Sequence, residues 1–332
     1  MDEASSMNSM RITLTLGTLC LFTCLANAAQ DNEAKESPDA KRPPVLERVY
    51  VAGASVSDGF GLSKDLKTSV KLSHVFQASC KAEEAEFIPL GDARFFLDPR
   101  NAGERIIQTA KDGEATCFVG VDFLFWYAYG IKSEKLRVSY VDAALKSLEE
   151  LECPVLLGDL PDMSIALEGN YFGRPMITPE MVPTKETLKT INEHLHAWTA
   201  AREDAHVVPL ASLLKKIQSG EDIQLREVLY QPESLKELMQ ADLLHLTAEG
   251  SMAVCLLVGD LLVKQYEELN AEDFVFDREA SMERLMAFAK EKREAEVLER
   301  EARREERRRE REERRKKKDE EDEAPSELRA AS

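Results

Sequence analysis

The sequence predicts an α/β domain of three layers, in which helices cover both faces of a mostly parallel sheet. Two features of the chain lead to this fold class. Apolar runs of strand length recur between residue 46 and about residue 270, and stretches with helical spacing separate them. The runs are continuously apolar rather than alternating, which is typical of strands that are buried on both faces. Strand and helix in repetition therefore indicate an α/β/α sandwich.

Five apolar runs are expected to form the strands of this sheet. They are RVYVAGAS (48–55), EAEFIPLG (84–91), ATCFVGVD (115–122), CPVLLGDL (153–160) and AHVVPL (205–210). In sheets of this kind, ligands bind beyond the carboxyl ends of the strands. A site is therefore expected in the loops that follow these runs.

Two of the intervening stretches have clear helical patterns behind threonines that suit the N-cap position, Thr184 and Thr247. Their apolar stripes consist of Leu188, Ile191, Leu195 and Trp198, and of Val254, Leu257, Val258, Leu261 and Leu262. The connection over residues 160–183 is longer than the roughly 12–15 residues beyond which loops are uncommon and often functional. We expect either a lid over the site or a passive excursion of the chain.

Residues 1–28 have the layout of a secretory signal peptide. Arg11 precedes an apolar run, and the small residues Ala26 and Ala28 suit a cleavage site after Ala28. This pattern predicts a periplasmic or secreted protein with no stable membrane span after cleavage. The alternative is a membrane anchor over residues 12–29, close to the lower limit of about 17 residues for a spanning helix. Threonines and a glycine in the run favour cleavage, and the polar residues 29–45 predict a disordered linker.

Charge and cysteine spacing bear on two further classes of function. The formal net charge of −18 at pH 7 argues against a nucleic-acid binder, because such proteins need a basic face to displace phosphate counterions. Four cysteines follow the signal segment: Cys80, Cys117, Cys153 and Cys255. Their spacing indicates neither a zinc site nor a disulfide framework, and whether any two form a disulfide stays open. We expect no metal and no cofactor.

Residues 271–332 form a charged C-terminal extension. Between Lys290 and Glu323 basic and acidic side chains balance, largely as acid-first pairs four residues apart. Each such pair stabilises a helix by about 0.2–0.5 kcal/mol. Apolar positions stop near Leu298, so a solvent-exposed helix is expected rather than a coiled coil. The alternative role of this helix is to dock a protein partner.

The loop GASVSDGFG (53–61) brings serines to the carboxyl end of the first expected strand. A serine becomes a nucleophile only when a base takes its proton and a third group orients that base. Asp242 precedes His245 by three residues, within reach of the imidazole Nδ1 in one turn. Taken alone, this pair is more typical of a surface ion pair. Together with a serine at the end of a strand, it favours a hydrolase site.

These residues resemble the SGNH (GDSL-like) hydrolase family. In that family a Gly-Asp-Ser motif follows the first strand, and an Asp-x-x-His motif precedes the last helix. The stretches GASVS and DLLHLT are similar to these motifs, with Ala54 in place of the usual acid. The resemblance covers about residues 46–270 and implies the flavodoxin-like fold of the family. It also implies Ser55 as the nucleophile, His245 as the general base and Asp242 as the residue that orients it.

The resemblance further implies three oxyanion donors, namely the serine N–H, a glycine after the second strand and an asparagine after the third. Gly91 suits the glycine position, whereas Asp122 stands at the position of the asparagine. An ionised carboxylate cannot donate to an oxyanion, and one lost donor costs about 10²–10³ in rate. Asp122 is therefore expected to be a protonated donor, a cap of the strand end or part of a differently built hole. The aromatic residues 125–129 are expected either to line the cleft or to belong to the core.

The expected function is that of an exported hydrolase that cleaves an ester through an acyl-enzyme on Ser55. Its substrate is expected to be a small-molecule or glycan ester, and a carbohydrate acyl ester would be typical of the family. The alternative is a non-catalytic SGNH-like domain that binds a ligand in the same cleft and docks a partner through the C-terminal helix. Asp122 favours this alternative, while the complete set of Ser55, Asp242 and His245 favours the enzyme.

Overall fold

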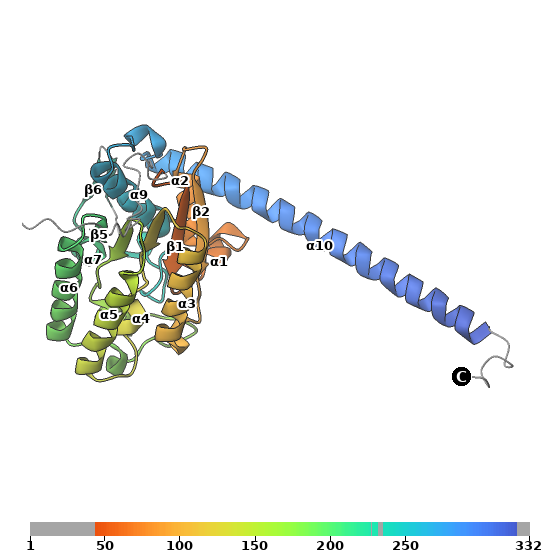
Figure 1. Ribbon diagram of the computed structural model, residues 1–332, viewed down its shortest axis with the longest axis horizontal. Helices are drawn as coiled ribbons and strands as arrows, with labels where there is room; N and C mark the ends of the chain where they lie inside the picture. The colour runs from red at the N-terminus through yellow and green to blue at the C-terminus, as the bar shows by residue number, and fades with distance from the viewer. Residues whose placement is uncertain (1–43, 227, 232–234, 324–332) are drawn as a thin grey trace, which may run out of the picture. The chain divides into compact units, whose positions relative to one another are not determined.

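A computed structural model describes residues 44–226, 228–231 and 235–323 of the chain (Figure 1). The expected signal peptide and nearly all of the expected linker lie outside the described residues, so export stays a prediction. Within the described ranges, no helix is both long enough and apolar enough to cross a membrane.

Five parallel strands form the central sheet in the order β2-β1-β3-β4-β5 (Figure 1). They are β1 (Arg48–Gly53), β2 (Glu86–Gly91), β3 (Cys117–Gly120), β4 (Val155–Gly158) and β5 (Ala205–Val208). Each strand lies within one of the five predicted runs, so the predicted parallel sheet is confirmed. The strand order is that of flavodoxin-like folds, in which ligands bind where the order reverses, between β1 and β3.

Helices cover both faces of this sheet, as predicted. One face is packed by α2 (Leu72–Ser79) and α9 (Ala248–Gln265), and the other by α3 (Pro99–Asp112), α5 (Glu134–Leu148) and α6 (Lys185–Ala200). The shorter elements are α1 (Leu62–Leu66), η1 (Phe95–Leu97), α4 (Phe125–Ala128), η2 (Met163–Glu168), η3 (Pro179–Met181), α7 (Leu210–Ser219), β6 (Ile223–Leu225), β7 (Val228–Tyr230), α8 (Leu235–Leu238) and η4 (Ala271–Asp273). The strands β6 and β7 form a separate antiparallel pair that the apolar pattern did not predict.

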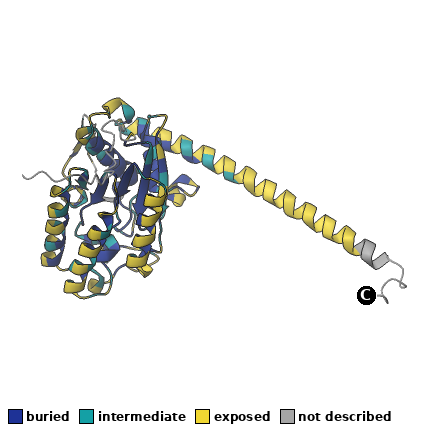
Figure 2. Cartoon of the chain, viewed as in Figure 1, coloured by how far each residue is buried: buried dark blue, intermediate teal, exposed yellow. Residues whose placement is uncertain are grey.

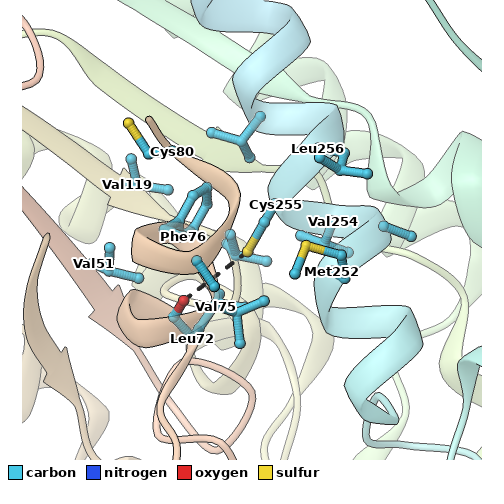
Figure 3. Packing of buried hydrophobic residues seen from close by; sticks show 14 of the residues in the cluster. Val51, Leu72, Val75, Phe76, Cys80, Val119, Met252, Val254, Cys255 and Leu256 are labelled. Atoms are coloured by element: carbon cyan, nitrogen blue, oxygen red, sulfur yellow. Dashed lines mark hydrogen bonds between the residues drawn. The ribbon is translucent and has the colours of Figure 1, made fainter. Parts of the chain in front are cut away.

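Alternate residues of the strands face two different cores. In β1, Val49 and Val51 belong to the core shared with α2 and α9, whereas Tyr50 and Ala52 belong to the core shared with α3, α5 and α6. Side chains of a strand alternate between the faces of a sheet, so a strand with a core on each side reads as continuously apolar. Figure 3 shows the first core, where Phe76 of α2 packs near Cys255 of α9.

Cys80, Cys117, Cys153 and Cys255 are all free and buried, so no two of them form a disulfide in the structure. The predicted N-caps are confirmed, because Thr184 Oγ1 accepts a hydrogen bond from the third residue of α6 at 3.2 Å and Thr247 Oγ1 accepts one from the third residue of α9 at 3.1 Å. Both helices therefore begin where the threonines predicted.

The C-terminal helix α10 (Arg278–Glu323) confirms the predicted long charged helix. Packing on the domain continues past residue 270, where we expected the domain to end. Leu285 and Ala289 are buried in the core that α2 and α9 share, and Arg284 donates hydrogen bonds to the carbonyl oxygens at the end of α2. Beyond residue 290 the described side chains are mostly exposed (Figure 2). The helix thus has an anchored first part and a solvated remainder.

We predict that Leu285→Ala destabilises the protein by about 2–5 kcal/mol, since it deletes a fully buried side chain. The matched control is Leu298→Ala in the same helix, where the leucine is 67% exposed. Its effect should stay within about 0.5 kcal/mol. Urea unfolding of the two variants measures both values. Equal effects would contradict the division of α10 into an anchored and a solvated part.

His74 of α2 lies against the anchored part of α10. Its Nδ1 accepts a hydrogen bond from the backbone N–H of Lys71 at 2.9 Å, and its ring centroid is 5.4 Å from that of Phe288. The Nζ of Lys292 is 3.5 Å from its Nε2. Burial and the charges of Lys292 and Lys71 lower the pKa of His74 to about 4.

We therefore predict a pH dependence of stability that His74 contributes. Between pH 6.5 and pH 4 the unfolded histidine binds a proton that the folded one refuses, so acidification across this window favours unfolding. His74→Gln keeps an acceptor for the Lys71 N–H but does not titrate. The melting temperature of the wild type should fall more steeply than that of the variant as pH decreases from 6.5 to 4. Parallel curves would show that His74 titrates alike in the folded and unfolded chains.

Candidate active site

Ser55 lies in the loop directly after β1, at the carboxyl end of the sheet. Its Oγ is 2.9 Å from Nε2 of His245, which belongs to the segment just before α9. The two residues are 190 positions apart in the chain, and the fold brings their side chains into hydrogen-bond contact. Ser55 is half-buried and lines a cavity, whereas His245 is buried.

Asp242 completes the arrangement that the sequence predicted. Its Oδ2 is 2.9 Å from Nδ1 of His245, and its Oδ1 accepts hydrogen bonds from the backbone N–H groups of Leu244 and His245, each at 3.0 Å. Burial alone would raise the pKa of Asp242, but the hydrogen bonds and charge of His245 outweigh it and hold this pKa below its usual range. A carboxylate only accepts hydrogen bonds. Nδ1 of His245 therefore donates its hydrogen to Asp242, and Nε2 faces the Ser55 hydroxyl.

The turn from Asp242 to His245 has two unusual backbone features, the left-handed conformation of Leu243 and the close approach of Gly169. Leu243 adopts a φ of 54°, a left-handed conformation that side-chain-bearing residues seldom take. The two backbone N–H groups that bind Asp242 Oδ1 stabilise this turn in return. Gly169 packs against the carbonyl oxygen of Asp242 so closely that an added Cβ would lie 1.9 Å from it. The segment 160–183 thus packs against the turn through Gly169.

Asp122 follows β3, and its carboxylate binds the loop that carries Ser55. Oδ1 accepts from the N–H of Ala54 at 3.0 Å, and Oδ2 accepts from the N–H of Val56 at 2.8 Å. The N–H and the hydroxyl of Ser57 donate to the same carboxylate. Burial raises the pKa of Asp122, and these hydrogen bonds oppose that rise. Asp122 therefore has the contacts of a cap that links the end of β3 to the loop after β1.

Gly53 is the residue that allows this approach. It has a φ of 150°, and an added Cβ would lie 2.1 Å from Oδ1 of Asp122 and 2.6 Å from Oγ of Ser57. No other residue type fits at this contact distance. Gly53 and Asp122 are therefore a matched pair at the adjoining ends of β1 and β3.

Gly91 ends β2 and pairs in register with Gly53. An added Cβ would lie 2.3 Å from the backbone nitrogen of Asp58 and 2.4 Å from the carbonyl carbon of Ser57. Gly91 thus lets the serine loop pack against β2, and it does not line the cavity next to Ser55. Its role as an oxyanion donor stays a prediction.

A cavity of about 90 Å³ opens next to Ser55 at the carboxyl ends of β3 and β4. Side chains from α7, from the segment before α9 and from the segment after β4 close it. The lining residues are Ser55, Val56, Val121, Asp122, Phe125, Asp159, Leu160, Pro161, Met163, Leu210, Leu213, Leu214, Ile217, Met239, Leu244, Leu246 and Val254. Of the aromatic residues 125–129, Phe125 lines the cavity, whereas Trp126, Tyr127 and Tyr129 are buried in the core.

Aromatic side chains flank the histidine. The ring centroids of Phe60 and His245 are 4.3 Å apart, and those of Phe60 and Tyr171 are 5.8 Å apart. The next residue, Phe172, is 86% exposed and has a φ of 51°. The segment 160–183 therefore borders the site, with Leu160 at the cavity and Tyr171 beside the aromatic group.

Two contributors to this geometry were missed by the sequence reasoning. Phe60 packs against the ring of His245, and Gln240 links the two loops. The Nε2 of Gln240 donates to the carbonyl oxygens of Phe60 and Leu246, both at 2.7 Å. Phe60 belongs to the stretch 53–61 that was singled out for its serines, so an apolar residue in a polar loop was the available signal. For Gln240 the sequence carries no such signal.

Comparisons with known proteins identify no family for this chain. No family model matches the sequence, and no curated protein matches it. Among solved structures, a gut microbial diltiazem-metabolizing enzyme is similar with a TM-score of 0.41 and 11% sequence identity. That match covers 64% of this chain and 46% of the other, so the chain spans less than half the length of that enzyme.

The hydrogen bonds of Asp122 lead to a prediction. Asn in its place keeps one acceptor oxygen and turns an amide group toward N–H donors, so Asp122→Asn should destabilise the protein by roughly 1.5–3 kcal/mol. Asp142→Asn is the matched control, because Asp142 is 47% exposed and pairs with the exposed His194. Thermal unfolding compares the variants. A melting temperature equal to that of the wild type would mean that the carboxylate does not hold the loop.

Proposed function

We propose that this protein is a serine hydrolase that cleaves an ester through an acyl-enzyme on Ser55. The observation that supports this proposal is the continuous chain of hydrogen bonds from Ser55 through His245 to Asp242, with 2.9 Å at each junction. This series of hydrogen bonds ends at Ser55, beside a cavity where a substrate has room to bind. Nucleophile, base and orienting carboxylate in this order are the arrangement that activates a hydroxyl.

In the proposed reaction, Ser55 Oγ attacks the ester carbonyl carbon while His245 Nε2 takes its proton. Asp242 accepts the Nδ1–H bond throughout and stabilises the imidazolium that forms. The tetrahedral intermediate collapses, the alcohol leaves with the proton from Nε2, and the acyl group stays on Ser55. Water then repeats the sequence, which releases the acid and restores the serine.

The oxyanion of the intermediate needs an N–H donor near Ser55. Asp122 occupies the N–H groups of Ala54, Val56 and Ser57. The N–H of Ser55 has no acceptor among the described residues. We propose this group as the first oxyanion donor, which Asp122 leaves free while it holds the neighbouring N–H groups in place.

Membership of the SGNH family and export to the periplasm or outside the cell are part of the same proposal. The resemblance is supported by the position of Ser55 directly after β1 and by the position of the Asp242–His245 pair directly before α9. The alternative of a ligand-binding domain without catalysis is favoured by one observation. Asp122 takes the place of an amide donor and supplies a carboxylate instead.

Labelling with a fluorophosphonate separates the two functions, because only an activated serine displaces the fluoride. We predict that the labelled peptide contains Ser55 and that Ser55→Ala abolishes both labelling and hydrolysis of 4-nitrophenyl esters. Ser63→Ala is the matched control, since Ser63 is an exposed serine on α1, and it should label and turn over like the wild type. Asp242→Asn should retain a slower, measurable rate. A folded wild-type protein that does not label at Ser55 would favour the ligand-binding alternative.

A further inference from the structure

We propose that the cavity next to Ser55 binds the acyl group of the substrate, and that this group is a neutral aliphatic chain longer than acetyl. This inference rests on the proposed hydrolase function. It names the acyl group of the proposed ester substrate by chemical class, as a short- to medium-chain fatty acid.

The lining of the cavity is mostly apolar. Fourteen of its side chains are apolar or proline, and they come from the serine loop, the segments after β3 and β4, α7, the segment before α9 and α9 itself. Leu213, Leu214 and Ile217 present one helical face of α7 to it. Apolar surface of this kind gains free energy when it excludes water in exchange for an alkyl chain. Sugar hydroxyls would find almost no hydrogen-bond partners on such a lining.

The volume of the cavity sets the size of the acyl group that it can hold. A cavity needs about 10–15 Å³ to hold one water molecule. The 90 Å³ next to Ser55 therefore accommodates several heavy atoms. An acetyl group adds a single methyl beyond the carbonyl carbon and leaves most of this space unfilled. A chain of several carbons fills it without a change of structure.

The charged side chains around the cavity favour a neutral acyl group. Its ionisable side chains are Asp122 and Asp159, and no basic side chain lines it within the part of the chain that the structure describes. Asp159 is 8% exposed and accepts a hydrogen bond from the N–H of Ala211 at 2.7 Å. Burial raises the pKa of this carboxyl. A substrate acyl group with its own carboxylate would meet two acidic groups and no counter-charge.

The test compares kcat/KM for 4-nitrophenyl acetate, butyrate and hexanoate and for the 4-nitrophenyl monoester of adipic acid. From acetate toward hexanoate, kcat/KM should rise by about fourfold for each added methylene until the cavity is full. The adipate monoester has the same chain length as hexanoate and carries a terminal carboxylate. It should react at least tenfold more slowly than hexanoate. Acetate as the best substrate, or equal rates for hexanoate and the adipate monoester, would overturn the inference.

Two variants connect this preference to the cavity. Leu210→Phe adds volume at a half-buried lining position and should move the preference back toward acetate. Leu214→Ala removes volume and should move it toward longer chains. The matched control is Leu136→Phe on α5, a partly exposed position that does not line the cavity, and its chain-length profile should equal that of the wild type. Profiles that do not change in either cavity variant would place the acyl group elsewhere.

Fluorophosphonate labelling distinguishes failure of this inference from failure of the proposed function. If Ser55 is labelled but the chain-length preference is absent, the hydrolase function stands and the acyl-binding role of the cavity is wrong. If folded protein is neither labelled nor active toward any of the four esters, the proposed function fails and this inference fails with it. Labelling together with the expected profile supports both.

Discussion

The site depends on one interaction, the binding of backbone N–H groups of the serine loop by the carboxylate of Asp122. The carboxylate lies at the end of β3 and the loop follows β1, so the contact joins the two strands between which the strand order reverses. Gly53 makes the contact sterically feasible. Turns within the loop use its carbonyl oxygens, and Asp122 accepts from the N–H groups on either side of Ser55, which fixes the position of that residue.

The histidine side of the site is held by a second set of contacts between distant segments. Asp242 orients His245 within one turn, but the turn itself is supported by Gly169 and by Gln240. Phe60, from the serine loop, packs against the imidazole ring. The serine loop and the turn that carries His245 therefore contact each other through more than the Ser55–His245 hydrogen bond. Such shared support suits the narrow limits on geometry that the proposed proton transfer requires.

The C-terminal helix α10 shows how burial changes along one continuous element. Its first part places Leu285 and Ala289 in the core, whereas the side chains of residues 293–318 are mostly exposed. Residues 271–289 therefore belong energetically to the domain. The exposed remainder is held by pairs of opposite charge four residues apart, such as Glu299 and Arg303.

The sequence by itself determined the strands, the starts of α6 and α9 and the local pair of Asp242 and His245, because each depends on residues close together in the chain. Apolar runs report burial on both faces of a strand, and a threonine cap or an Asp-x-x-His turn is completed within four residues. Only the tertiary structure decided that Asp122 caps the serine loop, that Phe60 lies on His245 and that the cavity beside Ser55 is apolar. These features join segments more than 60 residues apart, and such contacts form only when the sheet and its helices pack.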